Sequence, residues 1–380
     1  MSRQVVKTPR GCKGRSNIQP KLNELWFHLN QSCNLKCRYC LVDAGRETNK
    51  TLGIDEIKNI LEQAKILGAK RFYITGGEPY MLKRHKEIFE LILDYGELII
   101  LTNATLINED SYIPSPQKTL FQVSLDGTER INDLLRGKGS FNNALKGISA
   151  LKRKGHQPVI ASVVTKINIH NIPELTSFLG DIGITYHHLH FLHNRGRAKG
   201  NGLTYSIEDI PYYLEKIIEK GGLKQVLLDN YLSFAARISF PREKRYDLCH
   251  ACLEMVTIGP GGKVYPCPPF VGIEKFVLGN VKEEGLEEIW LKGNKVRQIR
   301  KETLFNCLEC RECEFNIYCG GGCLVYKYLE KGSLSTKDPF CEIYKYFIKK
   351  RLKEMESENI NISFLKNQSE NLKTLTFNCT

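Results

Sequence analysis

Three thiols occur within eight residues near the start of the chain. The segment is Cys33-Asn34-Leu35-Lys36-Cys37-Arg38-Tyr39-Cys40, and it follows a strand-like run over Glu24–Leu29. Thiols at this x3 and x2 spacing can bind three irons of a 4Fe–4S cluster and leave the fourth iron open to a small molecule. With His28 nearby they could instead bind a structural zinc, which accepts mixed Cys and His ligands. The triad alone leaves both alternatives open.

Flexible and polar residues follow the next strand-like segments. After Arg71–Thr75 comes Gly76-Gly77-Glu78-Pro79, where the glycines let the backbone approach a ligand closely and the proline fixes the turn. Asn103 and Ser124 stand at the ends of the next two strands, where they can hydrogen-bond a ribose or a carboxylate. Ordinary turn formation is the alternative for both, because strand-to-helix loops are rich in these residue types.

Four histidines lie in the segment Tyr186–His193. Strand alternation places His188 and His190 on one face and His187 and His193 on the other. One pair can therefore point into a barrel, and we take His188 and His190 as candidates for proton transfer. The alternative is a hydrogen-bonded core role, which is common for histidines on buried strands.

Strands and helices alternate from Glu24 to about Leu192, which is typical of a parallel sheet covered by helices. We predict strands over Glu24–Leu29, Arg71–Thr75, Glu97–Thr102, Thr119–Ser124, Pro158–Val164 and Tyr186–Leu192. We predict helices over Ile54–Leu67, Lys83–Asp94, Phe141–Lys154 and Asn171–Leu179. This α/β pattern fits a partial (β/α)6 barrel, whose chemistry belongs at the C-terminal ends of the strands.

Nine further cysteines lie in the C-terminal part of the chain, between Cys249 and Cys341. They are Cys249, Cys252, Cys267, Cys307, Cys310, Cys313, Cys319, Cys323 and Cys341. Groups of four thiolates can bind iron–sulfur clusters or zinc. We predict a smaller cysteine-rich iron–sulfur domain here, and two zinc sites are the alternative.

The composition limits which cellular compartment and which partners we expect. The 380 residues include 14 cysteines, and the N-terminus lacks the apolar core of a signal peptide, so we expect a cytoplasmic protein whose thiols bind metal rather than form disulfides. No apolar run is long enough to span a membrane. The net charge of +13 is spread along the chain without a dense basic run, so we expect solvated faces and no nucleic-acid partner.

Together these motifs resemble the radical SAM family with a C-terminal SPASM extension, and peptide-modifying maturases within it. The resemblance rests on the first cysteine loop with Tyr39, on the GGEP turn, and on the stretch from Arg136 to Phe141, which is similar to RGxGSF. Gly196-Arg197-Ala198 resembles a GxA-type turn near adenine. The pattern Cys252-x9-Gly262-x4-Cys267, followed by the later cysteines, resembles the seven-cysteine SPASM motif.

The resemblance implies roles for individual residues. Cys33, Cys37 and Cys40 would hold an open 4Fe–4S cluster that binds S-adenosylmethionine and cleaves it to a 5'-deoxyadenosyl radical. Contacts to S-adenosylmethionine are expected from Tyr39, Gly76, Gly77, Glu78, Pro79, Asn103, Ser124 and Arg136. The resemblance also implies two auxiliary 4Fe–4S clusters, which makes three clusters with the open one. One would be held by Cys249, Cys252, Cys267 and Cys323, and the other by Cys310, Cys313, Cys319 and Cys341. Cys307 is an additional thiol without an assigned role.

The resemblance also implies a function. We expect an oxidoreductase that abstracts hydrogen from a peptide or protein side chain during maturation, supplied with electrons by a flavodoxin or ferredoxin. Sulfatase-maturing relatives have an aspartate after the cysteine that matches Cys267, whereas Pro268 and Pro269 follow it here, which argues against sulfatase activation. The alternatives are side-chain modification of a haem-type tetrapyrrole and, in another class, an electron carrier without radical chemistry.

We predict five regions along the chain. They are an N-terminal arm over 1–22, a radical SAM partial barrel over 23–198, a helical bridge over 199–246, a SPASM domain over 247–345, and a helix and tail over 346–380. The short segment before Leu25 leaves no room for a separate leader-binding domain, so we expect the barrel or a partner protein to recognise a peptide substrate.

Overall fold

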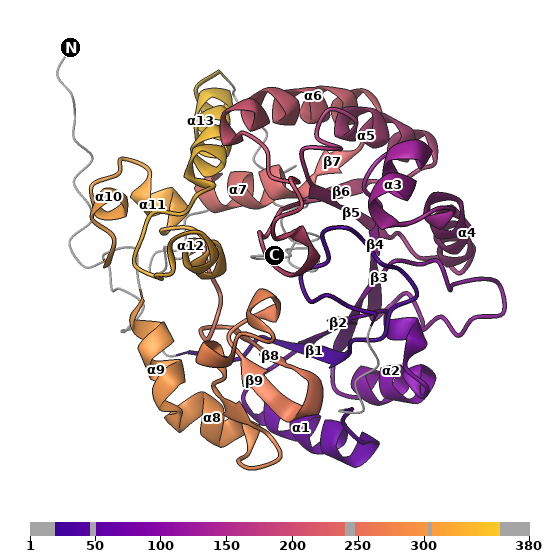
Figure 1. Ribbon diagram of the computed structural model, residues 1–380, viewed down its shortest axis with the longest axis vertical. Coiled ribbons are helices and arrows are strands. Elements are labelled where there is room, and N and C mark those ends of the chain that lie inside the picture. Colours follow the sequence, from indigo (N-terminus) through magenta and orange to yellow (C-terminus); the bar gives the residue numbers. More distant parts are fainter. Residues whose placement is uncertain (1–19, 46–50, 240–247, 303–305, 358–380) are drawn as a thin grey trace. The chain divides into compact units, whose positions relative to one another are not determined.

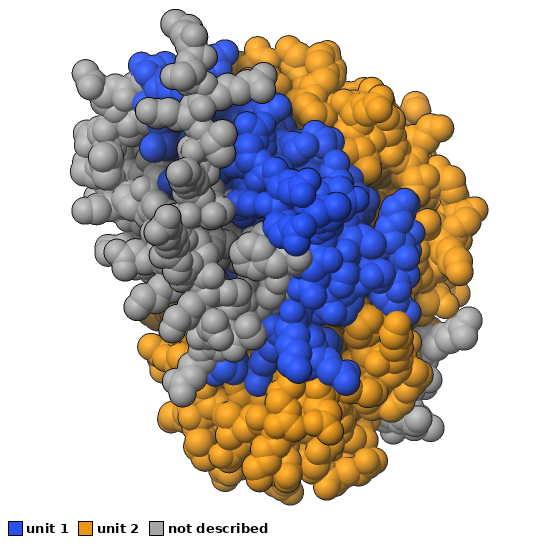
Figure 2. All heavy atoms as spheres, turned by 90° about the vertical axis from the view of Figure 1, so that its left-hand side faces the viewer, with its two compact units in different colours: residues 1–20, 229–250, 298–380 blue, residues 21–228, 251–297 orange. Residues whose placement is uncertain are grey.

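A computed structural model describes residues 20–45, 51–239, 248–302 and 306–357. Residues 1–19 of the predicted N-terminal arm and residues 358–380 of the predicted C-terminal tail lie outside these segments. The chain splits into two compact units, which are coloured separately in Figure 2: one comprises residues 21–228 and 251–297, and the other comprises residues 1–20, 229–250 and 298–380. We describe each unit by itself, and the five predicted regions stay a prediction.

The first unit is built on six consecutive parallel strands that lie side by side in sequence order (Figure 1). The strands are β1 (Glu24–Asn30), β2 (Arg71–Gly76), β3 (Glu97–Thr102), β4 (Thr119–Ser124), β5 (Val159–Val164) and β6 (Tyr186–Phe191). Their bounds agree with the predicted strands to within one or two residues. The predicted partial-barrel α/β fold is therefore confirmed.

The sheet also continues beyond these six strands. Strand β8 (Met255–Ile258) pairs in parallel with β1, and β9 (Lys263–Tyr265) and β10 (Gly279–Asn280) follow as antiparallel strands. At the opposite edge, the two-residue strand β7 (Leu227–Leu228) pairs with β6. The sequence analysis missed these strands because two to four residues are too few to show an alternating pattern. Cys252 and Cys267 thereby flank strands of the same sheet.

Helices cover the outer face of the sheet. They include α1 (Ile54–Ile66), α2 (His85–Leu93), α3 (Glu129–Arg136), α4 (Ser140–Arg153), α5 (Ile172–Asp181), α6 (Ile210–Leu223) and α8 (Leu286–Lys292). The strand side chains that face the helices are apolar and fully buried, and Phe27, Ile74 and Val123 are examples. The inner face is more polar and carries Trp26 stacked on Tyr73, with ring centroids 4.0 Å apart. A polar inner face suits a barrel that holds a polar ligand.

The second unit is mostly helical. It includes α7 (Asp229–Ser239), α10 (Leu308–Arg311), α11 (Asn316–Cys319), α12 (Leu324–Lys331) and α13 (Cys341–Ser357), and α9 (Asn294–Lys301) begins in the first unit and ends in this one. The rings of Phe234 on α7 and Phe347 on α13 stack 5.5 Å apart. None of the helices that the described residues form combines the length and apolar character needed to cross a bilayer.

Candidate functional site

The first cysteine loop begins where β1 ends. Backbone amides point at two of its sulfurs: the amide of Leu35 lies 3.5 Å from Cys33 Sγ, and the amide of Ala44 lies 3.3 Å from Cys40 Sγ. Burial raises the pKa of the Cys33 thiol and raises that of Cys37 to about 11. A free thiolate is therefore unfavourable at these positions. Iron ligation and N–H donors on the sulfurs would stabilise the thiolate form.

The glycines after β2 pack directly against this loop. A Cβ atom on Gly77 would lie 1.9 Å from the carbonyl oxygen of Ser32, and one on Gly76, whose φ is +126°, would lie 2.5 Å from that of Asn30. The amide of Glu78 donates to the Ser32 carbonyl over 2.8 Å. Only glycine fits such approaches, so the Gly-Gly-Glu-Pro turn and the cysteine loop form one packed structure.

The Glu78 carboxylate ties two strand ends together. It accepts hydrogen bonds from the Thr102 hydroxyl over 2.6 Å, from the Asn103 amide over 2.8 Å and from the Tyr80 amide over 3.2 Å. The carboxylate is almost fully buried, and burial raises its pKa to about 6 although the three donors oppose this shift. Because the Glu78 carboxylate accepts its three hydrogen bonds from neighbouring residues of the protein, we assign it the role of shaping the turn.

Asn103 lies beside the first cysteine. Its side-chain amide donates to Asn34 Oδ1 over 3.0 Å and lies 3.9 Å from Cys33 Sγ. The end of β3 is thus linked both to the cysteine loop and, through the Asn103 backbone, to Glu78. The predicted contact residue Pro79 is buried in the same turn, and Ser124 ends β4 on the inner face.

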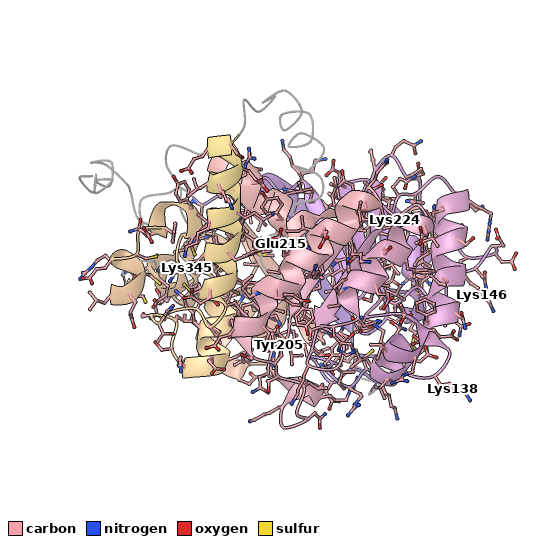
Figure 3. The ribbon with its side chains drawn as sticks, turned by 90° about the horizontal axis from the view of Figure 1, so that it is seen from above. Lys138, Lys146, Tyr205, Glu215, Lys224 and Lys345 are labelled. Carbon is pink, nitrogen blue, oxygen red and sulfur yellow. The ribbon has the colours of Figure 1, made fainter. Side chains whose placement is uncertain are left out.

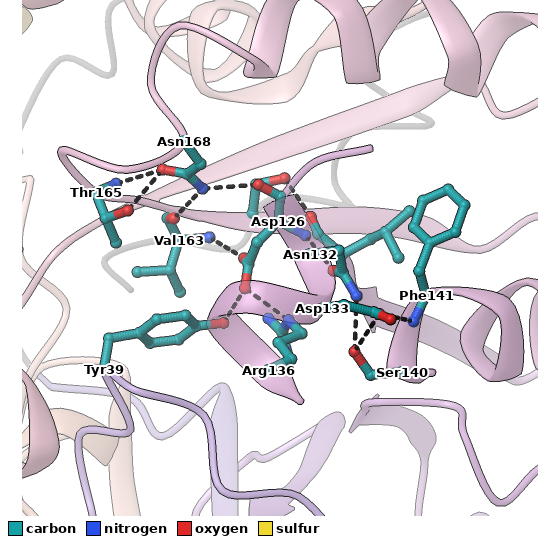
Figure 4. A network of polar contacts seen from close by, with 12 residues as sticks. Tyr39, Asp126, Asn132, Asp133, Arg136, Ser140, Phe141, Val163, Thr165 and Asn168 are labelled. Atoms are coloured by element: carbon teal, nitrogen blue, oxygen red, sulfur yellow. Dashed lines mark hydrogen bonds and ion pairs between the residues drawn. The ribbon is translucent and has the colours of Figure 1, made fainter. Parts of the chain in front are cut away.

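A buried charged network holds Tyr39, the residue before Cys40 in the chain (Figure 4). Asp126 Oδ2 accepts from the Tyr39 hydroxyl and lies 2.6 Å from Arg136 Nε, and Oδ1 accepts from the Val163 amide over 2.8 Å. The guanidinium also lies over the Tyr39 ring, 5.6 Å from its centroid. Tyr39 and Arg136, both predicted contacts for S-adenosylmethionine, are therefore held by Asp126, a residue that the sequence analysis did not select.

The turn after β6 clamps the cysteine loop from the other side. Arg197 donates from Nε to the Cys37 carbonyl, and from Nη1 to the Ala44 carbonyl and the Asp43 carboxylate, each over 2.7 Å. Gly196 reaches a φ of +61°, and a Cβ atom there would lie 2.2 Å from the Cys40 carbonyl oxygen. The sequence had indicated this turn only by its resemblance to an adenine-binding motif.

The strand histidines divide as alternation predicts. On the outer face, His187 is hydrogen-bonded to Ser162 over 2.8 Å and to Thr176 of α5 over 2.9 Å, and burial lowers its pKa to about 3. On the inner face, the rings of His188 and His190 meet edge to face 4.4 Å apart. His190 Nε2 lies 2.9 Å from the side-chain amide of Gln122. His188 and His190 thus face the barrel interior, and their proposed proton transfer stays a prediction.

Four cysteines of the second unit line a single cavity of about 450 Å³. They are Cys310, Cys313, Cys319 and Cys341. The cavity is also lined by Lys337 and by Lys345, which α13 carries (Figure 3). These are the four cysteines that the resemblance implies for one auxiliary cluster. Glu309, Glu312 and Glu314 also line the cavity, so its fit to a cubane rests on the four thiols.

The other four assigned cysteines are divided between the units. Cys249 and Cys323 are buried in the second unit, close enough for Cys249 to contribute to the raised pKa of Cys323, which burial mainly causes. Cys252 and Cys267 are buried in the first unit. Cys307 does not line the cavity, and its thiol lies 3.3 Å from Glu309. Among the residues that the structure describes, no three His, Cys, Asp or Glu side chains gather around a single-ion site.

Comparison with known proteins identifies the family. The family model of the radical SAM superfamily matches residues 28–179, and that of SPASM, an iron–sulfur cluster-binding domain, matches residues 249–314. The chain is therefore a radical SAM enzyme with a SPASM domain. Its cofactors are 4Fe–4S clusters and S-adenosylmethionine, which the cysteine loop and the thiol-lined cavity fit.

Three similar proteins illustrate the range of relatives. Mycofactocin maturase MftC of Mycolicibacterium smegmatis is 26% identical over 83% of this chain and 82% of its own length. AdoMet-dependent heme synthase of Nitratidesulfovibrio vulgaris is 25% identical over 88% of this chain and 96% of its own length. The solved structure of anSMEcpe with bound AdoMet and the Cp18Cys peptide has a TM-score of 0.74 at 20% identity and covers 92% of this chain and 99% of that one. The similarity to this solved structure shows that the two chains share a fold.

Proposed function

We propose that this chain oxidises a carbon of a peptide or protein side chain during post-translational maturation. The observation that carries the proposal is the convergence of the cysteine loop after β1, the Gly-Gly-Glu-Pro turn after β2 and the Gly196–Ala198 turn after β6, both of which contact that loop. When bound, the open cluster and S-adenosylmethionine supply a 5'-deoxyadenosyl radical that abstracts hydrogen. The names of the maturase and of the peptide complex above support a peptide as the substrate.

The residues of this chain position and shield that chemistry. Cys33, Cys37 and Cys40 would hold the open cluster, with Arg197 fixing the loop that carries them. The Gly76–Pro79 turn would present its backbone to S-adenosylmethionine, and the Asp126 network would fix Tyr39 beside it. Two auxiliary clusters that could accept an electron from the substrate would be held by Cys249, Cys252, Cys267 and Cys323, and by Cys310, Cys313, Cys319 and Cys341. An external flavodoxin or ferredoxin would supply reducing electrons in the cytoplasm.

The substrate class can be tested directly. Reconstituted enzyme is incubated under strict anaerobic conditions with S-adenosylmethionine, a reductant and a library of synthetic peptides, and the products are analysed by mass spectrometry. We expect a peptide that loses two hydrogens or gains a new cross-link in step with 5'-deoxyadenosine. A parallel reaction with a tetrapyrrole tests the haem-type alternative. Modification of the tetrapyrrole alone would contradict the proposal.

A further inference from the structure

Three neighbouring residues on the inner face of the barrel each bury a polar atom that has no hydrogen bond. Trp26 and His28 are two residues apart on β1, and Thr257 on β8 is the strand partner of Trp26, so the three side chains share one face. Within the part of the chain that the structure describes, Trp26 Nε1, His28 Nε2 and Thr257 Oγ1 have no partner, and the exposure of the three residues is at most 2%. All three belong to the first unit.

The outer face of the same sheet gives a contrast. There the two ring nitrogens of His187 lie 2.8 Å from the Ser162 hydroxyl and 2.9 Å from the Thr176 hydroxyl. The Thr176 hydroxyl also donates to the Ile172 carbonyl over 2.9 Å. A buried polar group without any partner is unfavourable, because it has lost its bonds to water and gained none in exchange. Three such groups at adjacent positions indicate that a bound molecule supplies their partners.

The unpaired nitrogen of His28 is a hydrogen-bond acceptor. Burial, and to a lesser extent the charge of Arg195, lowers the pKa of His28 to about 4, while a hydrogen bond with the Asn30 backbone opposes this shift. The ring is therefore neutral at pH 7 and has one donor and one acceptor nitrogen. A bond that favours the protonated ring uses its N–H group, so Nε2 is left to accept.

This nitrogen lies next to the turn after β2. A Cβ atom on Gly76 would lie 3.1 Å from His28 Nε2. On the same inner face, the Trp26 ring is stacked on Tyr73 with an angle of 5° between the two planes. The unpaired atoms are thus accompanied by a flat aromatic surface, and they begin beside the turn that is expected to present its backbone to S-adenosylmethionine.

The three atoms define the chemistry of their partner. The Trp26 indole N–H can only donate, so the ligand must offer an acceptor, whereas His28 Nε2 requires a donor and the Thr257 hydroxyl can bind either. A carboxylate only accepts and an ammonium only donates, but an amide offers a donor beside an acceptor. An amide is also planar and uncharged, which suits a buried site with a flat aromatic surface.

We propose that the inner face of β1 and β8 is a subsite for an amide group of the peptide substrate, where Trp26 donates to the amide oxygen and His28 accepts from the amide N–H. Thr257 binds the same group through its hydroxyl. This inference rests on the proposed function and adds the chemical group that is held beside the Gly76–Pro79 turn. Backbone peptide groups and the side chains of Asn and Gln share this chemistry.

The stability of the iron-loaded chain without substrate tests whether the Thr257 hydroxyl lacks a partner in the protein. Thr257→Val keeps the shape of the side chain and removes an unpaired hydroxyl, so we expect a urea midpoint equal to or above that of the wild type. Thr176→Val is the matched control, because it removes a buried hydroxyl that is hydrogen-bonded, and its midpoint should fall. An equal fall in both variants overturns the inference.

Kinetics with the peptide that the wild type modifies in the library assay test the subsite itself. Thr257→Val and Trp26→Phe should each raise KM about two- to tenfold, which corresponds to the loss of one hydrogen bond. Thr257→Ser keeps the hydroxyl and should restore KM, and the affinity for S-adenosylmethionine should stay at the wild-type value. An unchanged KM in Thr257→Val overturns the inference alone. Weaker binding of S-adenosylmethionine in that variant overturns the assignment to the substrate.

Substituted peptides show which amide is held. Each backbone amide is replaced in turn by an ester, which removes the N–H, and each Asn or Gln is replaced by Asp or Glu. One of these changes should raise KM for the wild type, and its effect should not add to that of His28→Phe, because both remove the same hydrogen bond. Additive effects overturn the inference while the peptide function stands. Modification of a tetrapyrrole and of no peptide overturns the proposed function and the inference with it.

Discussion

The two buried carboxylates at the barrel mouth, Glu78 and Asp126, are both used to hold other groups. Glu78 accepts three hydrogen bonds from neighbouring residues, and Asp126 neutralises Arg136 while orienting Tyr39. Each links segments that are far apart in sequence. At the level of single residues, the site depends on the positioning of the backbone and rings rather than on exposed acids and bases.

Replacement of Asp126 by asparagine should destabilise the protein strongly. Asparagine keeps one acceptor oxygen but loses the charge that compensates buried Arg136, and breaking a buried ion pair from one side costs about 3–5 kcal/mol. Tyr39→Phe removes a single hydrogen bond to this carboxylate and should cost about 1.5–3 kcal/mol. Anaerobic urea unfolding measures both. Equal losses for the two variants would show that the ion pair is not the dominant contribution.

Glu78→Gln should impair cleavage of S-adenosylmethionine while the iron of the first cluster is retained. One side-chain amide cannot accept from the Thr102 hydroxyl and from the Asn103 and Tyr80 amides together. A resulting displacement of the turn by about 1 Å would reduce deoxyadenosine formation on the order of 10²-fold. Glu90→Gln, at an exposed site on α2, is the control. Wild-type rates in Glu78→Gln would refute a positioning role for this carboxylate.

At the scale of elements, the cysteine loop is held between two turns that follow other strands. The Gly76–Pro79 turn after β2 packs on one side of it, and the Gly196–Ala198 turn after β6 holds the other. Parallel strands bring these turns together because their C-terminal ends share one edge of the sheet. The order of the strands therefore determines which turns can meet the loop.

Gly77→Ala should prevent the turn and the loop from packing together. The added Cβ would lie 1.9 Å from a backbone oxygen, so the backbone itself must shift. Gly222→Ala, in a helix with open space around the glycine, should instead be neutral or stabilise by up to about 1 kcal/mol. Iron content after reconstitution and the urea midpoint measure both effects. Full iron loading of Gly77→Ala at wild-type stability would contradict the packing argument.

Arg197→Lys should weaken retention of the first cluster. A lysine ammonium lacks the planar fork that reaches the Cys37 and Ala44 carbonyls and Asp43 together. We expect faster loss of iron to a chelator, with the auxiliary clusters unaffected. Lys199→Gln, two residues further along and exposed, serves as the control. Identical rates of iron loss in all three proteins would exclude a clamping role.

The sequence predicted those strands whose pattern lies within a short segment of the chain. The first six strands and the cysteine loop follow from alternation and thiol spacing, and the structure reproduces the strands closely. Helix α3 and the short strands β8 to β10 went unpredicted. Strands of two to four residues are too short to show an alternating pattern, and β8 pairs with β1, which is distant in the chain. Asp126 was not selected, and Arg197 was named only as part of a turn, because each acquires its role from residues at long sequence separation.

At the scale of the whole molecule, each compact unit contributes cysteines to the expected clusters. The first unit holds the open cluster's loop together with Cys252 and Cys267, and the second holds the thiol-lined cavity together with Cys249 and Cys323. Cysteines assigned to the auxiliary clusters therefore occur in both units.

The central claim is that one open cluster cleaves S-adenosylmethionine and two further clusters accompany it. The most direct test counts iron in anaerobically reconstituted protein and follows 5'-deoxyadenosine after addition of S-adenosylmethionine and dithionite, in the wild type and in Cys37→Ala. We predict about twelve irons per wild-type chain, and deoxyadenosine formation that is abolished in Cys37→Ala while the auxiliary clusters remain. A wild-type protein with little iron, or deoxyadenosine formation that survives the loss of Cys37, would contradict the account.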